Sequence, residues 1–596
     1  MNKSNRFHNL IRGLSITVLR FPFTSMLLVA AAAVNAVSIA SDKEHFNYLF
    51  TFLVGALWGI VMQVVYERFC EKAISRLTLM VGAGLLTFGY YLIVRPTPES
   101  STEITAKTFI ALFALFIAFI WIPSIKSETT FNDSFLIAFK SFFISLFYSL
   151  ILFSGMSIII TAVDRLLFKV HSDSYSHTAN IIFIVFAPMY FLSLIPVYPG
   201  KRDINDSPTE KAGKESQVIR LSECPRFLEI LLSYIIIPLT SVFTIILILY
   251  IVLNLSGDFW ADNLLEPMII TYSVVVILVY ILVSKLNNRF AVIFRKIMPK
   301  ILTPIVLFQI IASVLKITDT GLTHNRYFVI LYGIFACLSG IILSTVSLRK
   351  NGIIAILIIV FSLISIVPPV DAFTVSRMSQ IALLENILEK NNMLEQNEVK
   401  PKSDLREEDK DKIRKLTSYL WHMGYTDKIS WLPGDFNYYY DFGRVFGFDD
   451  YSKPGEIKYV SLRLNYGNPI DVSGYDYLVT SQISIIGEEP LAENIAVMKK
   501  GGKTLTLSKK ISDGNCHIIL TDENNTELLA FELTEILDKF LEYSDEKFTL
   551  TLKEATFVRE NESAEIAIII QSLNIEKSTD FESYNSDIHF LIGLKR

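Results

Sequence analysis

The chain has 596 residues, of which 51% are hydrophobic and 12% aromatic, and its mean hydropathy is +0.42. These values exceed those of an ordinary soluble globular protein and exclude a chain that lies wholly in water. The formal net charge is −4, but the part from Asp371 to Arg596 carries 26 basic and 39 acidic residues, a net charge of about −13. An acidic domain of this kind does not bind nucleic acid or anionic lipid headgroups electrostatically.

Eleven apolar stretches occur up to Val370, and each has about the length that crosses the roughly 30 Å hydrocarbon layer of a bilayer. They are Pro22 to Ala40, Tyr48 to Tyr66, Leu77 to Val94, Thr108 to Ile125, Phe135 to Ala162, Ala179 to Tyr198, Leu228 to Asn254, Pro267 to Ser284, Ile301 to Ile317, Tyr327 to Thr345 and Gly352 to Val370. The sequence therefore predicts an α-helical multi-pass bundle over residues 1–370, with about eleven transmembrane helices. The first stretch has no convincing small-residue cleavage site, so it is expected to be a helix rather than a signal peptide.

Small and basic residues refine this prediction. Gly55 and Gly59 form a GxxxG pattern, which lets helix backbones approach closely. The stretch from Phe135 to Ala162 is long for one crossing, and its Lys140 is expected to extend to the membrane interface.

Lysine and arginine are concentrated in alternate connections between the stretches. One set holds about three times as many of them as the other, and it includes the amino terminus and the loop from Lys201 to Arg226. Basic flanks resist translocation, so this set is expected to be cytoplasmic. With an odd number of crossings, everything after Val370 is then expected outside the cytoplasm.

Residues 371–452 are predicted to form a helical, aromatic-rich connector. Apolar residues recur with a helical period from Val375 to Leu394, which predicts an amphipathic helix that docks on the bundle or under the following domain. Nine aromatic residues then lie between Trp431 and Tyr451. Aromatic rings offer flat apolar faces with polar edges, so the cluster is interpreted either as a small core or as a binding platform for a sugar or a lipid headgroup. Its candidate binding residues are Trp431, Tyr438, Tyr439 and Tyr440.

Residues 453–596 are predicted to form an exported soluble α+β domain. Short β-rich runs alternate with turn signals such as Gly501-Gly502 and Asn524-Asn525, which favours a mainly antiparallel sheet. One amphipathic helix is predicted from Leu533 to Tyr543. About 140 residues are enough for such a domain to bury its own core.

Motifs that carry chemistry are scarce. No Asp, Glu or His lies deep in a predicted span, whereas ion-coupled transporters use such groups. Pro188, Pro238 and Pro304 predict kinks, or alternatively the broken helices of a transporter site. The sequence shows no Walker loop, nucleophile elbow or HExxH, and its histidine spacings match no metal signature. We therefore predict no catalytic residue, no cofactor and no metal site, and an enzyme is less favoured than a non-enzymatic protein.

Three segments resemble a known family. They are Leu19-Arg20-Phe21-Pro22, then Val375-Ser376-Arg377-Met378-Ser379-Gln380 followed by Leu383, Leu384, Leu388 and Met393, and finally Val472-Ser473-Gly474-Tyr475-Asp476-Tyr477. Together with the bundle of about eleven spans, they are similar to the bacterial membrane family called domain of unknown function 4153. The resemblance implies a protein of the bacterial cytoplasmic membrane and brings no catalytic residues. Tyr475, Asp476 and Tyr477 join the candidate binding residues.

These observations favour a cell-envelope protein whose bundle anchors and presents an exported binding or sensing domain. Its expected partners are the lipid bilayer and an envelope protein or neutral glycan, without nucleic acid. A transporter or permease is the alternative, because eleven spans exceed what an anchor requires. A membrane glycosyltransferase is a third reading, based on Asp42 and Glu44, but the loop from Ser41 to Asn47 is too short to build its metal site. The oligomeric state, the ligand and the type of bacterial host do not follow from the sequence.

Overall fold

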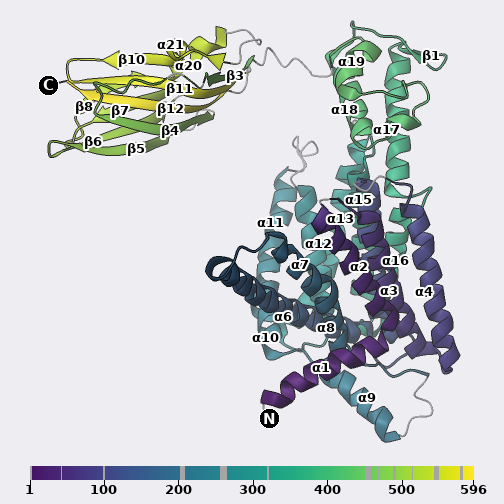
Figure 1. Ribbon diagram of the computed structural model, residues 1–596. Helices are drawn as coiled ribbons and strands as arrows, with labels where there is room; N and C mark the ends of the chain where they lie inside the picture. Colours follow the sequence, from purple (N-terminus) through teal and green to yellow (C-terminus); the bar gives the residue numbers. More distant parts are fainter. Residues whose placement is uncertain are drawn as a thin grey trace. The chain divides into compact units, whose positions relative to one another are not determined.

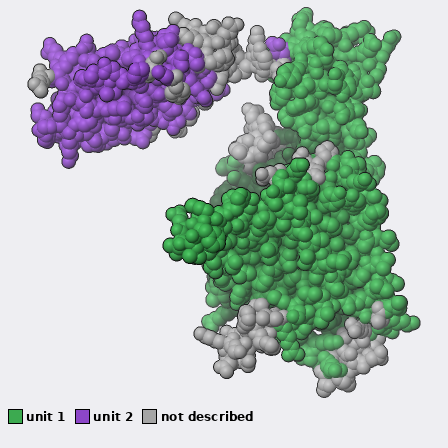
Figure 2. All heavy atoms as spheres, in the orientation of Figure 1, with its two compact units in different colours: residues 1–448 green, residues 449–596 purple. Residues whose placement is uncertain are grey.

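Residues 1–448 and residues 449–596 form two compact units, each with cores of its own (Figures 1 and 2). The structure is a computed structural model, and it describes residues 3–41, 43–97, 101–201, 208–254, 265–317, 321–449, 458–465, 467, 469–486, 491–512, 515–542, 549–577 and 582–595. We call residues 1–448 the helical unit and residues 449–596 the β unit.

Ten described helical segments of the helical unit are long and apolar enough to cross a membrane. They are α2 (Pro22–Ser41), α3 (Phe46–Phe69), α4 (Ala73–Val94), α5 (Thr102–Trp121), α6 (Phe131–Leu166), α7–η2–α8 (Asp173–Leu194), α10–η4–α11 (Arg226–Asn254), α13 (Arg289–Leu315), α15 (His324–Thr345) and α16 (Gly352–Ile366). The shorter apolar helix α12 (Leu265–Leu282) corresponds to the remaining predicted span. The predicted multi-pass bundle is therefore confirmed, with a helix at each of the eleven predicted positions.

Side-chain caps and small residues explain several helix starts and contacts. Thr130 and Asp133 form a reciprocal capping box at the start of α6, and Thr323 accepts a hydrogen bond at the start of α15. A Cβ added at Gly55 or Gly59 would lie within 2.8 Å of side-chain atoms of α2, so these glycines permit the close contact of α2 with α3. The stretch predicted from Phe135 to Ala162 is a single helix of 36 residues, α6.

The prolines predicted to bend helices lie in segments that remain helical. Pro188 and Pro238 each follow a π-helical turn, η2 (Ile181–Phe186) and η4 (Leu231–Ile236). Proline has no backbone N–H and crowds the preceding turn, and a π-helical turn accommodates this change in the hydrogen-bond pattern. Pro304 lies inside α13. These segments are therefore distorted locally and are not split into half-helices.

Further helices lie at the two ends of the bundle. In Figure 1, α1 (Lys3–Arg20) and α9 (Pro208–Leu221) lie at one end, and α17 (Ala372–Lys390), α18 (Glu407–His422) and α19 (Tyr438–Phe446) lie at the other. Two short strands, β1 (Leu394–Glu395) and β2 (Glu398–Val399), form a ribbon between α17 and α18. The three helices share an apolar core that includes Leu384 and Leu388. We call residues 371–448 the helical cap.

The described residues of the β unit form two sheets. Its strands are β3 (Lys458–Leu464), β4 (Tyr477–Ile486), β5 (Leu491–Lys500), β6 (Lys503–Ser512), β7 (Asn515–Thr521), β8 (Glu527–Glu532), β9 (Thr549–Leu550), β10 (Thr556–Glu560), β11 (Ala564–Lys577) and β12 (Glu582–Leu594). One sheet has the order β4-β12-β11-β3-β9, with β10 also paired to β11, and the other is the meander β5-β6-β7-β8. The pairings are antiparallel except that of β3 with β9, which confirms the predicted mainly antiparallel sheet.

One apolar core joins both sheets of the β unit. Alternate residues of β6 and β7 are buried, as expected for strands with one face against a core. Gly501 and Gly502 both have positive φ values, 58° and 87°, and join β5 to β6 in the two-residue turn that such glycines favour. The predicted helix after Leu533 is the short helix α20 (Thr534–Asp538), which continues as the 3-10 turn η8 (Lys539–Glu542).

Candidate functional sites

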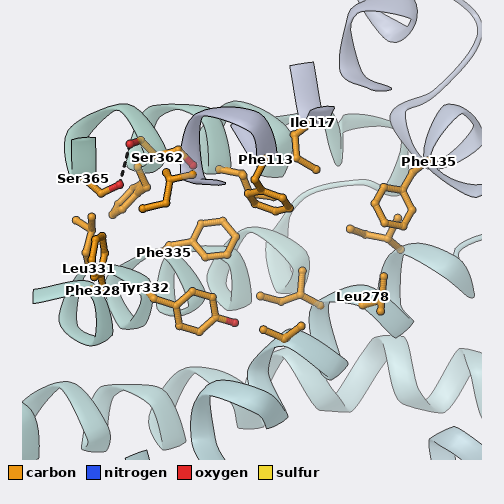
Figure 3. A pocket seen from close by; sticks show the side chains of 16 residues that line it. Phe113, Ile117, Phe135, Leu278, Phe328, Leu331, Tyr332, Phe335, Ser362 and Ser365 are labelled. Carbon is orange, nitrogen blue, oxygen red and sulfur yellow. Dashed lines mark hydrogen bonds between the residues drawn. The ribbon is translucent and has the colours of Figure 1, made fainter. Parts of the chain in front are cut away.

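An apolar cavity of about 420 Å³ lies between α5, α6, α12, α15 and α16 (Figure 3). Its lining is aromatic and aliphatic apart from three hydroxyl-bearing residues, Tyr332, Ser362 and Ser365. The Tyr332 hydroxyl shares a hydrogen bond of 2.9 Å with Ser273, and the Ser365 hydroxyl donates to the Ser362 carbonyl at 2.8 Å. Two of these hydroxyl groups are therefore already bonded within the protein.

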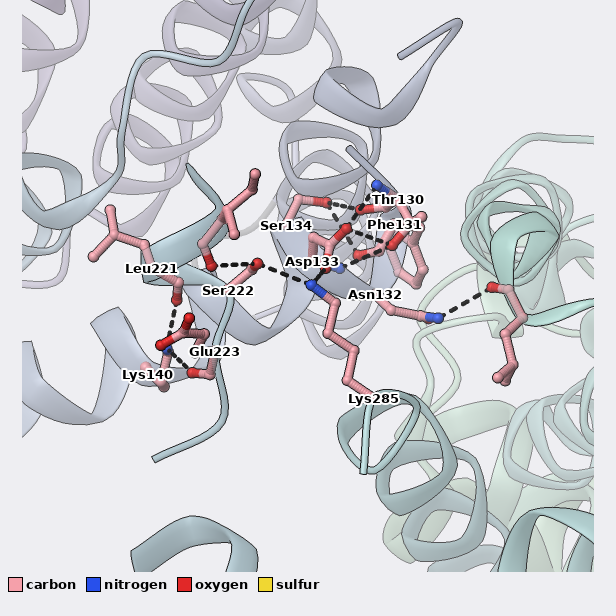
Figure 4. Close-up of polar contacts among 12 residues, drawn as sticks. Thr130, Phe131, Asn132, Asp133, Ser134, Lys140, Leu221, Ser222, Glu223 and Lys285 are labelled. Atoms are coloured by element: carbon pink, nitrogen blue, oxygen red, sulfur yellow. Dashed lines mark hydrogen bonds and ion pairs between the residues drawn. The ribbon is translucent and has the colours of Figure 1, made fainter. Parts of the chain in front are cut away.

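The start of α6 forms a polar cluster with neighbouring helix ends (Figure 4). The capping residue Asp133 is paired with Lys285, which also donates to the Ser222 hydroxyl at 2.9 Å. Lys140 donates to the carbonyl oxygens of Leu221 and Glu223 at the carboxyl end of α9. A cation is favourable there because the last carbonyl groups of a helix carry partial negative charge. The ammonium of Lys140, which is predicted to lie at the membrane interface, therefore also binds the carboxyl end of α9.

A second polar cluster contains Arg20, which belongs to the first family-like segment, Leu19 to Pro22. Arg20 donates from Nε and Nη2 to the two carboxylate oxygens of Glu67, both at 2.8 Å, and from Nη1 to the Ile195 carbonyl at 2.7 Å. Glu67 is 9% exposed. This planar, two-pronged contact is one that arginine makes and lysine cannot. It ties α1 to α3 and to the end of α8. Gly200 packs against the backbone of Glu67, because a Cβ added at position 200 would lie 2.1 Å from the Glu67 carbonyl oxygen.

The helical cap is joined to the bundle by a buried carboxylate. Asp371 is fully buried, caps α17 through the backbone N–H groups of Phe373 and Thr374, and lies 2.9 Å from Lys107 of α5. Burial acts to raise the pKa of Asp371, but hydrogen bonds from Thr374 and Lys107 outweigh it, so that its pKa is lowered. The carboxylate therefore stays ionised and links α5 to α17.

The second family-like segment adds polar contacts to the same joint. Ser376 and His324 both hydrogen-bond to the Tyr419 hydroxyl, at 2.6 Å and 2.8 Å, and Ser379 accepts from the Leu322 backbone N–H at 3.1 Å. The His324 ring also stacks on Phe373 with a centroid distance of 5.2 Å. Residues of this segment therefore attach α17 to both α15 and α18. We call this set of contacts the cap joint.

The aromatic candidates occupy two different environments. Trp431 is 8% exposed and donates from its indole N–H to Glu385, and Tyr438 is 7% exposed within the cap core. Tyr439 and Tyr440 are 61% and 86% exposed. Tyr439 also packs edge-on against Trp421, with a centroid distance of 5.2 Å. The binding role of the four residues stays a prediction. Tyr439 and Tyr440 are the two whose rings a ligand can reach.

The candidates in the third family-like segment lie at the start of β4. Tyr475 donates to Glu565 at 2.7 Å, Asp476 pairs with Lys500 and accepts from the Leu594 backbone N–H at 2.9 Å, and Tyr477 donates to the Lys499 carbonyl. Burial, together with the Glu565 carboxylate, raises the pKa of Tyr475 to about 12. Each side chain has a partner inside the β unit, and their binding role also stays a prediction.

Among the described residues, no group of three or more His, Cys, Asp or Glu is placed to hold a metal ion. The four cysteines are free thiols, and burial raises the pKa of Cys516 to about 11. A thiol with a raised pKa is a poor nucleophile at neutral pH.

Comparison with known protein families gives a match over most of the helical unit. A family model described as Domain of unknown function (DUF4153) matches residues 23–396, which is more than half of the chain. The match includes the membrane bundle and the second family-like segment, whereas Leu19 to Pro22 lies before it and Val472 to Tyr477 lies beyond it. No curated protein and no solved structure matches the chain significantly. The chain is therefore a multi-pass membrane protein that belongs to the family of the domain of unknown function DUF4153.

Proposed function

We propose that this protein is a bacterial cell-envelope protein that anchors and presents an exported binding or sensing domain. The observation that carries the proposal is the division of the polypeptide into separate cores. The apolar residues of the β unit pack into one core, and those of the bundle and the helical cap pack into two others. A domain with its own core can act outside the membrane while the bundle holds it there.

The distribution of basic residues supports the proposed orientation. α1 and α9 lie at one end of the bundle (Figure 1). Arg20 is the last residue of α1, and the ammonium of Lys140 binds the carboxyl end of α9. The helical cap lies at the other end. Basic segments stay in the cytoplasm, so this arrangement favours a cytoplasmic amino terminus and an extracytoplasmic cap and β unit.

The proposed binding surface includes Tyr439 and Tyr440 of the cap. Exposed tyrosine rings suit a sugar or a protein surface, because each offers an apolar face and a polar hydroxyl. The net charge of about −13 after Val370 disfavours polyanions as partners. A neutral glycan or an envelope protein therefore fits this surface better than nucleic acid or an anionic lipid.

Thiol labelling tests the proposed orientation. Cys516 is buried, so the exposed positions Asp404 and Glu523 are better probes as single cysteines in a chain without the native thiols. We expect a membrane-impermeant maleimide to label Asp404→Cys and Glu523→Cys in cells whose outer surface is open to the reagent. Arg349→Cys, at the proposed cytoplasmic end, should be labelled only after lysis. The reverse pattern would contradict the exported domain.

Sedimentation tests the binding role. The full chain in nanodiscs and a chain truncated after Phe448 would be mixed with cell-envelope fragments, either intact or stripped of protein. We expect the full chain to sediment with at least one preparation. Retention on stripped fragments indicates a glycan, and retention on intact fragments alone indicates a protein. Equal sedimentation of the truncated chain would assign binding to the helical unit, which includes Tyr439 and Tyr440 of the cap, and would contradict a binding role of the β unit. No sedimentation of either chain would contradict a binding domain for envelope components.

A further inference from the structure

We infer that the cavity between α5, α6, α12, α15 and α16 is a binding site for an acyl chain of a membrane phospholipid. The lining of this cavity is apolar except for the hydroxyl groups of Tyr332, Ser362 and Ser365 (Figure 3). Water needs two to four polar partners to enter such a space, whereas apolar cavities take up hydrocarbon. The hydroxyl groups of Tyr332 and Ser365 are bonded to protein atoms and do not supply those partners.

Molecules reach the cavity from the side on which its lining residues are exposed. Of its 16 lining residues, only Phe113 and Val274 are exposed, at 51% and 45%. Phe113 lies near the middle of α5 (Thr102–Trp121), and Val274 lies near the middle of α12 (Leu265–Leu282). Both positions fall at mid-depth of helices assigned to the membrane, where the surrounding solvent is lipid tail. A water-soluble ligand does not arrive there, and a lipid chain does.

A neighbouring hollow extends the apolar surface towards the lipid. It has a volume of about 280 Å³ between α5 and α6 and shares Phe135 with the larger cavity. Phe142 and Phe143 line it and are 48% and 52% exposed. Apolar side chains therefore extend from the exposed surface of α6 to Phe135, which lines both spaces. The cavity volume lies within the range of about 300–1,000 Å³ that is usual for ligand sites.

Part of the lining is buried enough to separate a bound chain from ordinary surrounding lipid. Ile117, Ile277 and Ile281 line the cavity and are 3%, 6% and 4% exposed. Lipid that only surrounds the protein does not touch these side chains. A photoreactive group carried on an acyl chain would reach them only from inside the cavity.

Photolabelling of the full chain tests the inference. The chain would be reconstituted in phospholipid vesicles that contain a phospholipid with a diazirine near the end of one acyl chain. We expect adducts on Ile117, Ile277 or Ile281 after irradiation, in addition to adducts on exposed residues such as Leu363. Val276 and Ala336 are buried in the bundle core and do not line the cavity, so they report background labelling. Lining residues labelled no more than these two would overturn the inference.

A pair of matched variants tests the space itself. Ser362→Leu places extra hydrocarbon in the cavity, whereas Leu363→Phe enlarges a neighbouring side chain that is 49% exposed and does not line it. We expect Ser362→Leu to lose the adducts on the buried isoleucines and Leu363→Phe to keep them. Adducts that persist in Ser362→Leu would overturn the inference.

The unmodified chain distinguishes the source of the hydrocarbon and remains a test if Ser362→Leu fails to fold. A polyisoprenyl phosphate with the same photoreactive group would be compared with the phospholipid in parallel vesicles. Preferred labelling by the phospholipid supports an acyl-chain site. Labelling of the buried isoleucines by the isoprenoid alone would overturn the assignment to phospholipid.

Discussion

Asp371 illustrates how one residue performs two functions that the sequence does not reveal together. Its position before α17 is that of a helix cap, which local sequence signals. Its pairing with Lys107 joins residues far apart in the chain, and no spacing or periodicity predicts it. The same holds for Arg20 and Glu67, where the family-like segment indicates importance but not the partner.

We predict that the charge of Asp371 stabilises the helical unit separately from its capping role. Asp371→Asn keeps a capping side chain and removes the charge, whereas Asp371→Ala removes both. The melting temperature of the purified chain in detergent at pH 7 should therefore fall in both variants. Loss of the cap should cost Asp371→Ala about 1 kcal/mol more than Asp371→Asn. Equal stability of Asp371→Asn and the unaltered chain would show that the charge is dispensable.

The lowered pKa of Asp371 predicts an acid dependence of the same joint. A carboxyl group whose pKa is lowered by folding stabilises the folded state above its unfolded value of about 3.9, and this stabilisation is lost as the pH falls through the folded pKa. The stability difference between the unaltered chain and Asp371→Asn should be constant above about pH 5 and shrink below about pH 4. A difference independent of pH over this range would contradict the prediction.

The contact between Arg20 and Glu67 predicts a further effect at the other end of the bundle. Arg20→Lys keeps the charge but cannot reproduce both hydrogen bonds, so we expect the free energy of unfolding to fall by about 1.5–3 kcal/mol. Arg12 of the same helix is exposed, and Arg12→Lys is the matched control. The stability of both variants would be measured by thermal unfolding in detergent. Similar values for the two would indicate that the paired geometry contributes little.

The elements differ in how far the sequence predicts them. The periodicity from Val375 to Leu394 predicts α17, and the spacing of four between Tyr438 and Phe442 marks the buried side of α19. Within the aromatic cluster, this spacing distinguishes the buried Tyr438 from the exposed Tyr439 and Tyr440. The amino-acid composition of the cluster alone does not distinguish them. The π-helical turns before Pro188 and Pro238 are not predicted, because hydropathy carries no information on backbone hydrogen-bond pattern.

We predict that the apolar side of α17 holds the helical cap together. Leu384 and Leu388 are 1% and 0% exposed, and truncating a buried leucine costs about 2–5 kcal/mol. Leu384→Ser combined with Leu388→Ser should therefore unfold the cap and make residues 391–448 sensitive to added protease, while the bundle remains inserted. Met378→Ser on the same helix is the control, because Met378 is 64% exposed. Unchanged cleavage in the double variant would mean that the cap does not depend on this face.

At the scale of the whole molecule, the change in hydropathy near Val370 predicts both the apolar bundle and the β-rich unit that follows it. It does not predict how the bundle helices pack, because a helix that is apolar on all sides has no polar face to show which side points into the bundle. The cavity between α5, α6, α12, α15 and α16 depends on that packing, so the hydropathy pattern does not predict it. Its lining comes from helices widely separated in the sequence.

The separate core of the β unit predicts that it folds alone. A fragment of residues 449–596 should be soluble and unfold cooperatively in urea, because both sheets share one core. Ile568 is fully buried in that core, so Ile568→Ala should lower the free energy of unfolding by about 2–5 kcal/mol. A fragment that aggregates, or one whose transition is unaffected by Ile568→Ala, would show that the core needs the rest of the chain.

The length of α6 has a consequence for the surrounding membrane. At 1.5 Å per residue, its 36 residues extend about 54 Å, whereas the hydrocarbon layer is about 30 Å thick. Charged residues lie towards both of its ends, Asp133 and Lys140 at one and Asp164 and Arg165 at the other, and beyond them Leu166, Leu167 and Phe168 are exposed by 80%, 74% and 67%. An apolar helical stretch that exceeds the hydrocarbon layer is accommodated by tilt or by local thickening of the bilayer. The tilt of α6 therefore depends on the thickness of the surrounding bilayer. The helix favours membrane regions whose hydrocarbon thickness matches the depth that the tilted helix spans.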